Sequence, residues 1–161
     1  MTISKGDTLP DVTMTRMGSD GPETVQLASV LSGRKVVVFA LPGAFTGGCS
    51  TVHLPSFIRT ADAFRAKGVD EIVCIAVNDP FVLDAWAETS GGKAAGITFL
   101  GDSEGALTQA LGMAFTAPAI GLIGRSNRYA ALIEDGVVTA VQIDAPGACD
   151  LSTGERFLEA I

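Results

Sequence analysis

Cys49 stands where a reactive cysteine is expected. It follows an apolar run, residues 36–41, and a glycine-rich loop, residues 42–48, while the residues after it are typical of a helix. The unpaired N–H groups and the dipole at the start of a helix favour an anion, and thiolate is the reactive form of cysteine. A strand, a loop and a helix that begins at Cys49 therefore predict a thiol that ionises easily and does cysteine chemistry.

Two other chemistries would use a loop of this kind, and the sequence argues against both. Residues 43–50 nearly match the phosphate-binding pattern G-x-x-x-x-G-K-[ST], but Cys49 takes the place of the lysine that reaches the terminal phosphates. A cysteine phosphatase closes its loop with an arginine, whereas the first arginine after Cys49 is Arg59, well inside the helix.

A cysteine peroxidase needs a thiolate, a nearby hydroxyl donor, cover from water and a cation that holds the leaving oxygen. Thr46 lies three residues before Cys49, so its hydroxyl can turn back towards the sulfur, although an N-cap is the ordinary role of such a threonine. Pro42 can cover the pocket. The cation must come from elsewhere in the chain, and Arg125 and Arg128 stand at the entrance to a predicted strand.

Three blocks of the sequence resemble one known family. The segment LPGAFTGGCS, residues 41–50, with His53-Leu54-Pro55 after it, resembles the active-site segment of the peroxiredoxins, most closely their type II branch with its atypical two-cysteine members. Residues 68–82 with Trp86, and residues 125–129 with 134–138, are similar to the same branch in the same order. The resemblance implies a thioredoxin-like α/β fold and a thiol peroxidase that reduces hydrogen peroxide and organic hydroperoxides, with a role in antioxidant defence.

The resemblance also assigns roles to residues. It implies that Cys49 is the peroxidatic cysteine, that Thr46 and Arg128 hold the peroxide, and that Pro42 shields the thiolate. One departure is Gly47, because the branch usually has proline directly after the threonine, and glycine makes the loop more flexible.

The thiol that resolves the oxidised Cys49 stays open between two cysteines and an external reductant. Cys74 lies in an apolar run that predicts a buried strand, so we interpret it as a core residue. Cys149 lies in a segment with the composition of a surface loop and is the candidate resolving cysteine, or else an incidental exposed thiol. If neither resolves, the family points to glutathione, glutaredoxin or thioredoxin.

Secondary candidates remain beside the loop. His53 lies one helical turn after Cys49, so a Cys–His pair is conceivable, but a structural contact is the commoner role of such a histidine. Arg125 is the alternative cation to Arg128. The ordinary role of either arginine would be an exposed charge at the end of a strand. We expect Pro55 to kink the helix, and Phe81 and Trp86 to pack or to form an interface.

The elements expected around Cys49 alternate along the chain. We predict a hairpin over residues 12–27, strands at 35–41, 71–77 and 97–100, and helices at 49–67, 79–89 and 103–111. A second hairpin, residues 128–143, turns at Asp135-Gly136, and a capping box at residues 152–155 opens a last helix. The alternation predicts a mixed β-sheet flanked by helices, with an N-terminal β-hairpin extension, in one domain over residues 1–161.

Net charge and cysteine content limit the classes of partner that this protein can have. The chain has 161 residues and a net charge of −7, which argues against nucleic acid and anionic membranes as partners. Three cysteines without a C-x-x-C pattern indicate free thiols, and we expect neither a metal nor a cofactor. Because no secretory signal is visible, we expect a cytoplasmic location; the family suggests a homodimer. A non-enzymatic redox sensor and a thioredoxin-like binding module are the alternatives to an enzyme.

Overall fold

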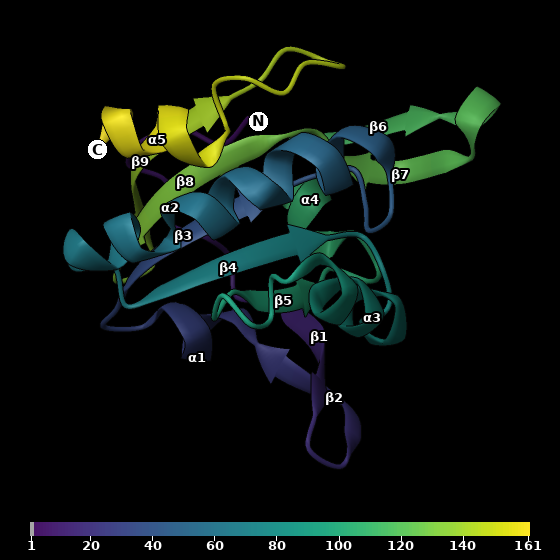
Figure 1. Cartoon of the computed structure of the whole chain (residues 1–161), viewed down its shortest axis with the longest axis horizontal. Helices are drawn as coiled ribbons and strands as arrows, with labels where there is room; N and C mark the ends of the chain where they lie inside the picture. Colours follow the sequence, from purple (N-terminus) through teal and green to yellow (C-terminus); the bar gives the residue numbers. More distant parts are fainter. Residues whose placement is uncertain (1) are drawn as a thin grey trace.

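A single seven-stranded sheet forms the centre of the protein in the computed structural model, which describes residues 2–161. Its strand order is β2-β1-β5-β4-β3-β8-β9 (Figure 1). The central pairs β3–β4 and β4–β5 are parallel, and the other pairs are antiparallel. The strands are β1 (Thr13–Gly18), β2 (Gly21–Gln26), β3 (Lys35–Ala40), β4 (Glu71–Ala76), β5 (Thr98–Gly101), β8 (Tyr129–Glu134) and β9 (Val137–Ile143).

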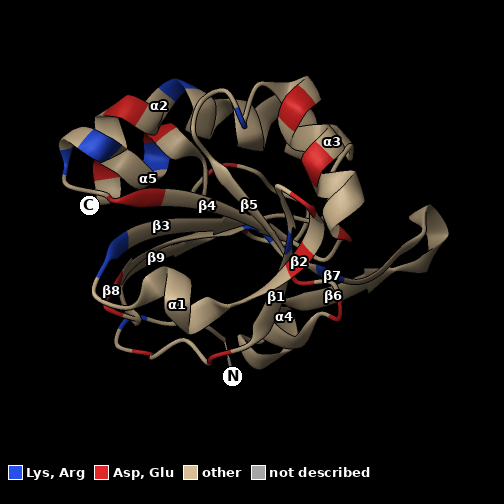
Figure 2. Ribbon diagram, turned by 90° about the horizontal axis from the view of Figure 1, so that it is seen from below, with Lys and Arg blue, Asp and Glu red and all other residues tan. Residues whose placement is uncertain are grey.

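Helices cover both faces of this sheet, which explains why its central strands β3 and β4 are apolar after their first residue. Figure 2 shows α2 (Leu54–Ala66), α3 (Pro80–Ser90) and α5 (Gly154–Ala160) on one side, and α1 (Leu27–Leu31) and α4 (Ala106–Ala110) on the other. Along β3, Val36 and Val38 pack on the α1 and α4 side, while Val37 and Phe39 pack under α2. A strand buried on both faces needs apolar residues at every position.

The predicted fold class is confirmed, including both hairpins. The turn between β8 and β9 uses Asp135 and Gly136 at φ of 49° and 80°, the left-handed conformation that Asp-Gly hairpin turns adopt. The helix predicted at residues 103–111 is shorter, because Gly105 at φ 74° precedes its first turn.

Three local features differ from the predictions. The helix α1 was not expected, and neither was a hairpin of β6 (Ala114–Ala117) and β7 (Leu122–Ser126), joined by the 3₁₀ turn Pro118–Ile120. This hairpin projects from the body of the molecule (Figure 1). The prediction of a capping box is wrong, because Thr153 is the N-cap of α5 and its side chain makes no capping hydrogen bond. No helix within residues 2–161 is long and apolar enough to span a membrane.

Candidate active site

Antiparallel pairing brings Arg128 to the loop that precedes Cys49. The loop follows the carboxyl end of β3, and β8 runs antiparallel to β3 with Tyr129 opposite Ala40. The first residues of an antiparallel strand lie beside the last residues of its partner. Arg128, directly before β8, therefore lies at the loop although 79 residues separate it from Cys49.

Two side chains hold the loop, Asn78 after the end of β4 and Arg125 in β7. The Ala44 N–H donates to Asn78 Oδ1 at 2.9 Å, and Arg125 Nη1 donates to the carbonyl oxygen of Pro42 at 3.0 Å. A Cβ at Gly43 would lie 2.3 Å from that Arg125 nitrogen. Arg125 therefore contacts the loop backbone, whereas the sequence offered it as an alternative to Arg128 for the cation that holds the leaving oxygen.

Thr46 bonds within its own loop. Its hydroxyl donates to the carbonyl oxygen of Gly43 at 2.7 Å, and its own carbonyl accepts from the Ser50 N–H at 3.0 Å. The tight turn also puts Phe45 at φ 61°. The Thr46 oxygen keeps its lone pairs for a further hydrogen bond, because a hydroxyl accepts as well as donates.

The helix that carries Cys49 begins with a π-helical turn, Cys49–His53, and continues as α2. Pro55 lies at the first turn of α2 and has no N–H to bond the carbonyl four residues earlier, and the Leu54 N–H donates to the Cys49 carbonyl in the wider π pattern. The π-helical turn thus takes the place of the kink predicted at Pro55.

Arg128 joins the side chains of Cys49 and His53. Its Nη1 donates to Cys49 Sγ at 3.1 Å and to His53 Nδ1 at 3.2 Å. Cys49 is fully buried, and a Cβ at Gly48 would lie 2.9 Å from Arg128 Nη2. A guanidinium in this position stabilises negative charge on the sulfur and on an oxygen beside it, and Gly48 leaves room for it.

His53 is buried at the back of the site. Its Nε2 lies 3.0 Å from the carbonyl oxygen of Ser152, a residue whose hydroxyl donates to Asp144. Burial, with the charge of Arg128 as a second cause, lowers the pKa of His53 to about 4, although the Ser152 carbonyl and Asp144 act in the opposite direction. The imidazole is therefore neutral at physiological pH.

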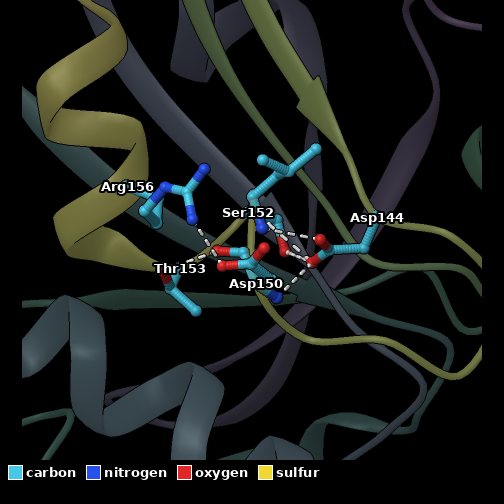
Figure 3. Close-up of polar contacts among 6 residues, drawn as sticks. Asp144, Asp150, Ser152, Thr153 and Arg156 are labelled. Atoms are coloured by element: carbon cyan, nitrogen blue, oxygen red, sulfur yellow. Dashed lines mark hydrogen bonds and ion pairs between the residues drawn. The ribbon is translucent and has the colours of Figure 1, made fainter.

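The carboxylate of Asp144 organises the turn that leads into α5 (Figure 3). It accepts from the backbone N–H groups of Asp150, Leu151 and Ser152, at 3.1, 2.7 and 3.3 Å. The sequence did not connect Asp144 or Ser152 with the site: Ser152 was expected only as part of a capping box, and nothing in the local pattern of either residue links it to His53. Asn78 lies at a strand end that the sequence does mark, but its bond to Ala44 is a tertiary contact.

The other two cysteines differ in access. Cys74 lies in β4, fully buried, and burial raises its pKa well above the ordinary value, with Cys49 adding to the rise. Cys149 is partly exposed in the loop after β9. Burial raises its pKa, while Arg128 lowers it and Asp144 and Cys49 raise it, so Cys149 is within electrostatic range of the candidate site. Within residues 2–161, no three or more His, Cys, Asp or Glu side chains are grouped to hold a metal.

Known proteins with similar sequence and structure include peroxiredoxins. Residues 4–156 match the family model named Redoxin. Peroxiredoxin-2E-2, chloroplastic, from Oryza sativa subsp. japonica is 46% identical over 99% of this chain and 73% of its own length. The crystal structure of reduced Prx3 in complex with H2O2 from Vibrio vulnificus has a TM-score of 0.91 and 42% identity, over 99% of each chain.

The same comparison contradicts the cytoplasmic location expected from sequence. Besides the chloroplastic relative from rice, Peroxiredoxin-2F, mitochondrial, from Arabidopsis thaliana is 43% identical over 86% of this chain and 69% of its own length. The names of these two relatives place those proteins in organelles. The expectation rested on a missing secretory signal, which says nothing about routes to organelles, and it is withdrawn.

Proposed function

The chain belongs to the peroxiredoxins and is a thiol peroxidase, and from this premise we propose that Cys49 is its peroxidatic cysteine, served by Arg128, Thr46 and Pro42. The observation that supports the assignment is the 3.1 Å contact of Arg128 Nη1 with Cys49 Sγ. A redox sensor or an inert binding module is not favoured by these relatives.

The proposed reaction begins with attack of the Cys49 thiolate on one peroxide oxygen. A sulfur–oxygen bond forms, the O–O bond breaks, and the second oxygen leaves with negative charge and takes up a proton, as water or an alcohol. Arg128 stabilises that charge as it develops, while the Thr46 hydroxyl holds the peroxide and Pro42 limits access of water. Cys49 becomes a sulfenic acid.

Regeneration requires two thiols. The first thiol displaces water from the sulfenic acid and forms a disulfide with Cys49. The second thiol attacks the other sulfur of that disulfide, releases the Cys49 thiolate and forms a disulfide with the first thiol; where the first thiol belongs to the chain, a further external thiol reduces this disulfide. We propose Cys149 as the first thiol, because it is partly exposed and within electrostatic range of Cys49, whereas Cys74 is fully buried in β4. Glutathione, glutaredoxin or thioredoxin would then supply the reducing equivalents.

Mass spectrometry after one equivalent of hydrogen peroxide tests the thiol assignment. We expect a Cys49–Cys149 disulfide in the wild-type chain and in Cys74→Ser, and a bare sulfenic acid in Cys149→Ser. A wild-type protein that stays at the sulfenic acid until glutathione is added would place the resolving thiol outside the chain.

Peroxide consumption with a thiol reductant tests the roles of Cys49 and Arg128. We expect Cys49→Ser to abolish turnover and Arg128→Ala to lower the rate constant for peroxide by about 100-fold or more, because removing one such donor costs that much in other sites. Arg125→Ala is the matched control, since it removes a guanidinium that contacts the loop backbone. An equal loss in both arginine variants would contradict the assignment of Arg128.

We also propose a homodimer. Among the large apolar side chains exposed within residues 2–161, Phe45 lies in the loop, Phe81 in α3, and Ile120 and Ile123 in the β6–β7 hairpin. Exposed apolar side chains that gather into one patch are typical of interaction surfaces. Sedimentation should give a dimer for the wild-type protein and a monomer for Phe81→Glu; a wild-type monomer at every concentration would contradict the proposal.

A further inference from the structure

Arg128 is held by a neutral partner rather than by a carboxylate. Within residues 2–161, no Asp or Glu forms an ion pair with it, although Arg16, Arg34, Arg59, Arg65 and Arg156 each have such a pair. The side chains that its guanidinium contacts are Cys49 and His53. A carboxylate would fix the guanidinium but neutralise the charge that the sulfur and the leaving oxygen need, whereas an imidazole fixes it and leaves that charge intact.

The tautomer of His53 follows from its partners. Arginine has donors only, so Nδ1 must be the acceptor in the 3.2 Å contact with Arg128. The proton is then on Nε2, which donates to the carbonyl oxygen of Ser152 at 3.0 Å. This bond fixes both the tautomer and the orientation of the ring.

The Ser152 carbonyl is itself held in place. The Ser152 hydroxyl and N–H both donate to the Asp144 carboxylate, which also holds the turn before α5 (Figure 3). The rings of Phe39 and Phe57 pack on the imidazole, with centroids 5.3 and 5.8 Å away. A rigid chain of contacts therefore runs from Asp144 through Ser152 and His53 to Arg128.

We propose that His53 is a positioning residue, whose unprotonated Nδ1 aims the Arg128 guanidinium at the reacting sulfur and oxygen, with its tautomer set by Ser152 and Asp144. The proposal rests on the functions proposed for Cys49 and Arg128 and adds a third residue to them. His53 does not touch the peroxide; its effect passes through the arginine.

Two substitutions distinguish the roles of the two nitrogens of the His53 ring. His53→Asn keeps an acceptor oxygen at the distance of Nδ1 from Cβ, and His53→Gln keeps an amide N–H donor at the distance of Nε2. Both shorten or open the buried ring, so both should lower stability to a similar extent. Only His53→Asn retains an acceptor opposite Arg128.

The readout is the ratio of two rate constants of Cys49, one for hydrogen peroxide and one for alkylation by iodoacetamide, each followed on the Cys49 peptide by mass spectrometry. Iodoacetamide releases iodide and has no leaving oxygen for Arg128 to hold. We expect this ratio to fall about tenfold or more in His53→Gln, the effect of losing one hydrogen bond to a charged group. His53→Asn should stay within about threefold of wild type by the same reasoning.

A structural role alone would lower stability in both variants and leave the ratio unchanged in both. That result, or an equal fall in His53→Asn and His53→Gln, would overturn the proposal while leaving Cys49 and Arg128 in their roles. A wild-type chain that does not react with peroxide would instead overturn the proposed function, and this inference with it.

A second measurement needs no variant. His53 is the single histidine of the chain, so its imidazole ¹⁵N signals are unambiguous. We expect the Nε2–H tautomer at neutral pH. An Nδ1–H tautomer, or a ring averaging between the two, would overturn the proposal even if a variant failed to fold.

Discussion

Acidification should destabilise this protein through His53. The ordinary pKa of 6.5 applies to this histidine in the unfolded chain, whereas burial lowers its pKa to about 4 in the folded protein, with Arg128 contributing to the shift. Between these two values the unfolded chain binds a proton that the folded protein excludes. Stability is therefore complete above pH 6.5 and is lost progressively as the pH falls towards 4.

The size of the loss follows from the two pKa values. A difference of about 2.5 pKa units corresponds to roughly 3 kcal/mol in all, of which about 2 kcal/mol is lost between pH 7 and pH 5. This is a large share of the free energy of unfolding of an ordinary domain, which is about 5–15 kcal/mol.

Urea unfolding at a series of pH values measures this loss, with His53→Asn as the control. Both proteins carry the same Asp and Glu residues, so the difference between their free energies of unfolding isolates the pH-dependent contribution of the imidazole. We expect the advantage of wild type over the variant to shrink by about 2 kcal/mol from pH 7 to pH 5. A difference that stays constant over this range would refute the placement of a neutral, buried His53.

Three further substitutions test what stabilises the fold at three separate positions. Gly154→Ala puts a Cβ 2.4 Å from the carbonyl oxygen of Ser56, so α5 must move off α2; thermal melts should show a loss of about 1–3 kcal/mol, and an unchanged melting temperature would contradict this close approach. Asp102→Ala leaves two buried N–H groups at the start of α4 without their acceptor and should cost about 3 kcal/mol in urea unfolding, with the peroxide rate constant of the folded protein unchanged. Gly47→Ala should gain about 0.4–1 kcal/mol by restricting the unfolded chain, because the added Cβ meets nothing within 4 Å; a loss of stability would show that this position needs glycine.

The parts of the fold that could be predicted are those with strong local patterns. The apolar runs of β3 and β4 indicated buried central strands, and Asp135-Gly136 indicated the hairpin of β8 and β9. The β6–β7 hairpin was missed because its strands are short and only partly buried, although Pro118 and Gly121 mark its turn. The helix α1 has five residues and no side-chain cap, so it leaves little pattern in the sequence.

The sequence by itself determined where the sulfur proposed to react lies and which loop precedes it, because a strand, a tight loop and a helix start are local features set by neighbouring residues. It did not determine which arginine contacts Cys49, since Arg125 and Arg128 lie three positions apart. Strand pairing decided that Arg128 contacts the sulfur at 3.1 Å, while Arg125 bonds the Pro42 carbonyl. The tertiary structure likewise joined His53 to Ser152, 99 residues away, because a polar side chain has many potential partners and only the fold selects one.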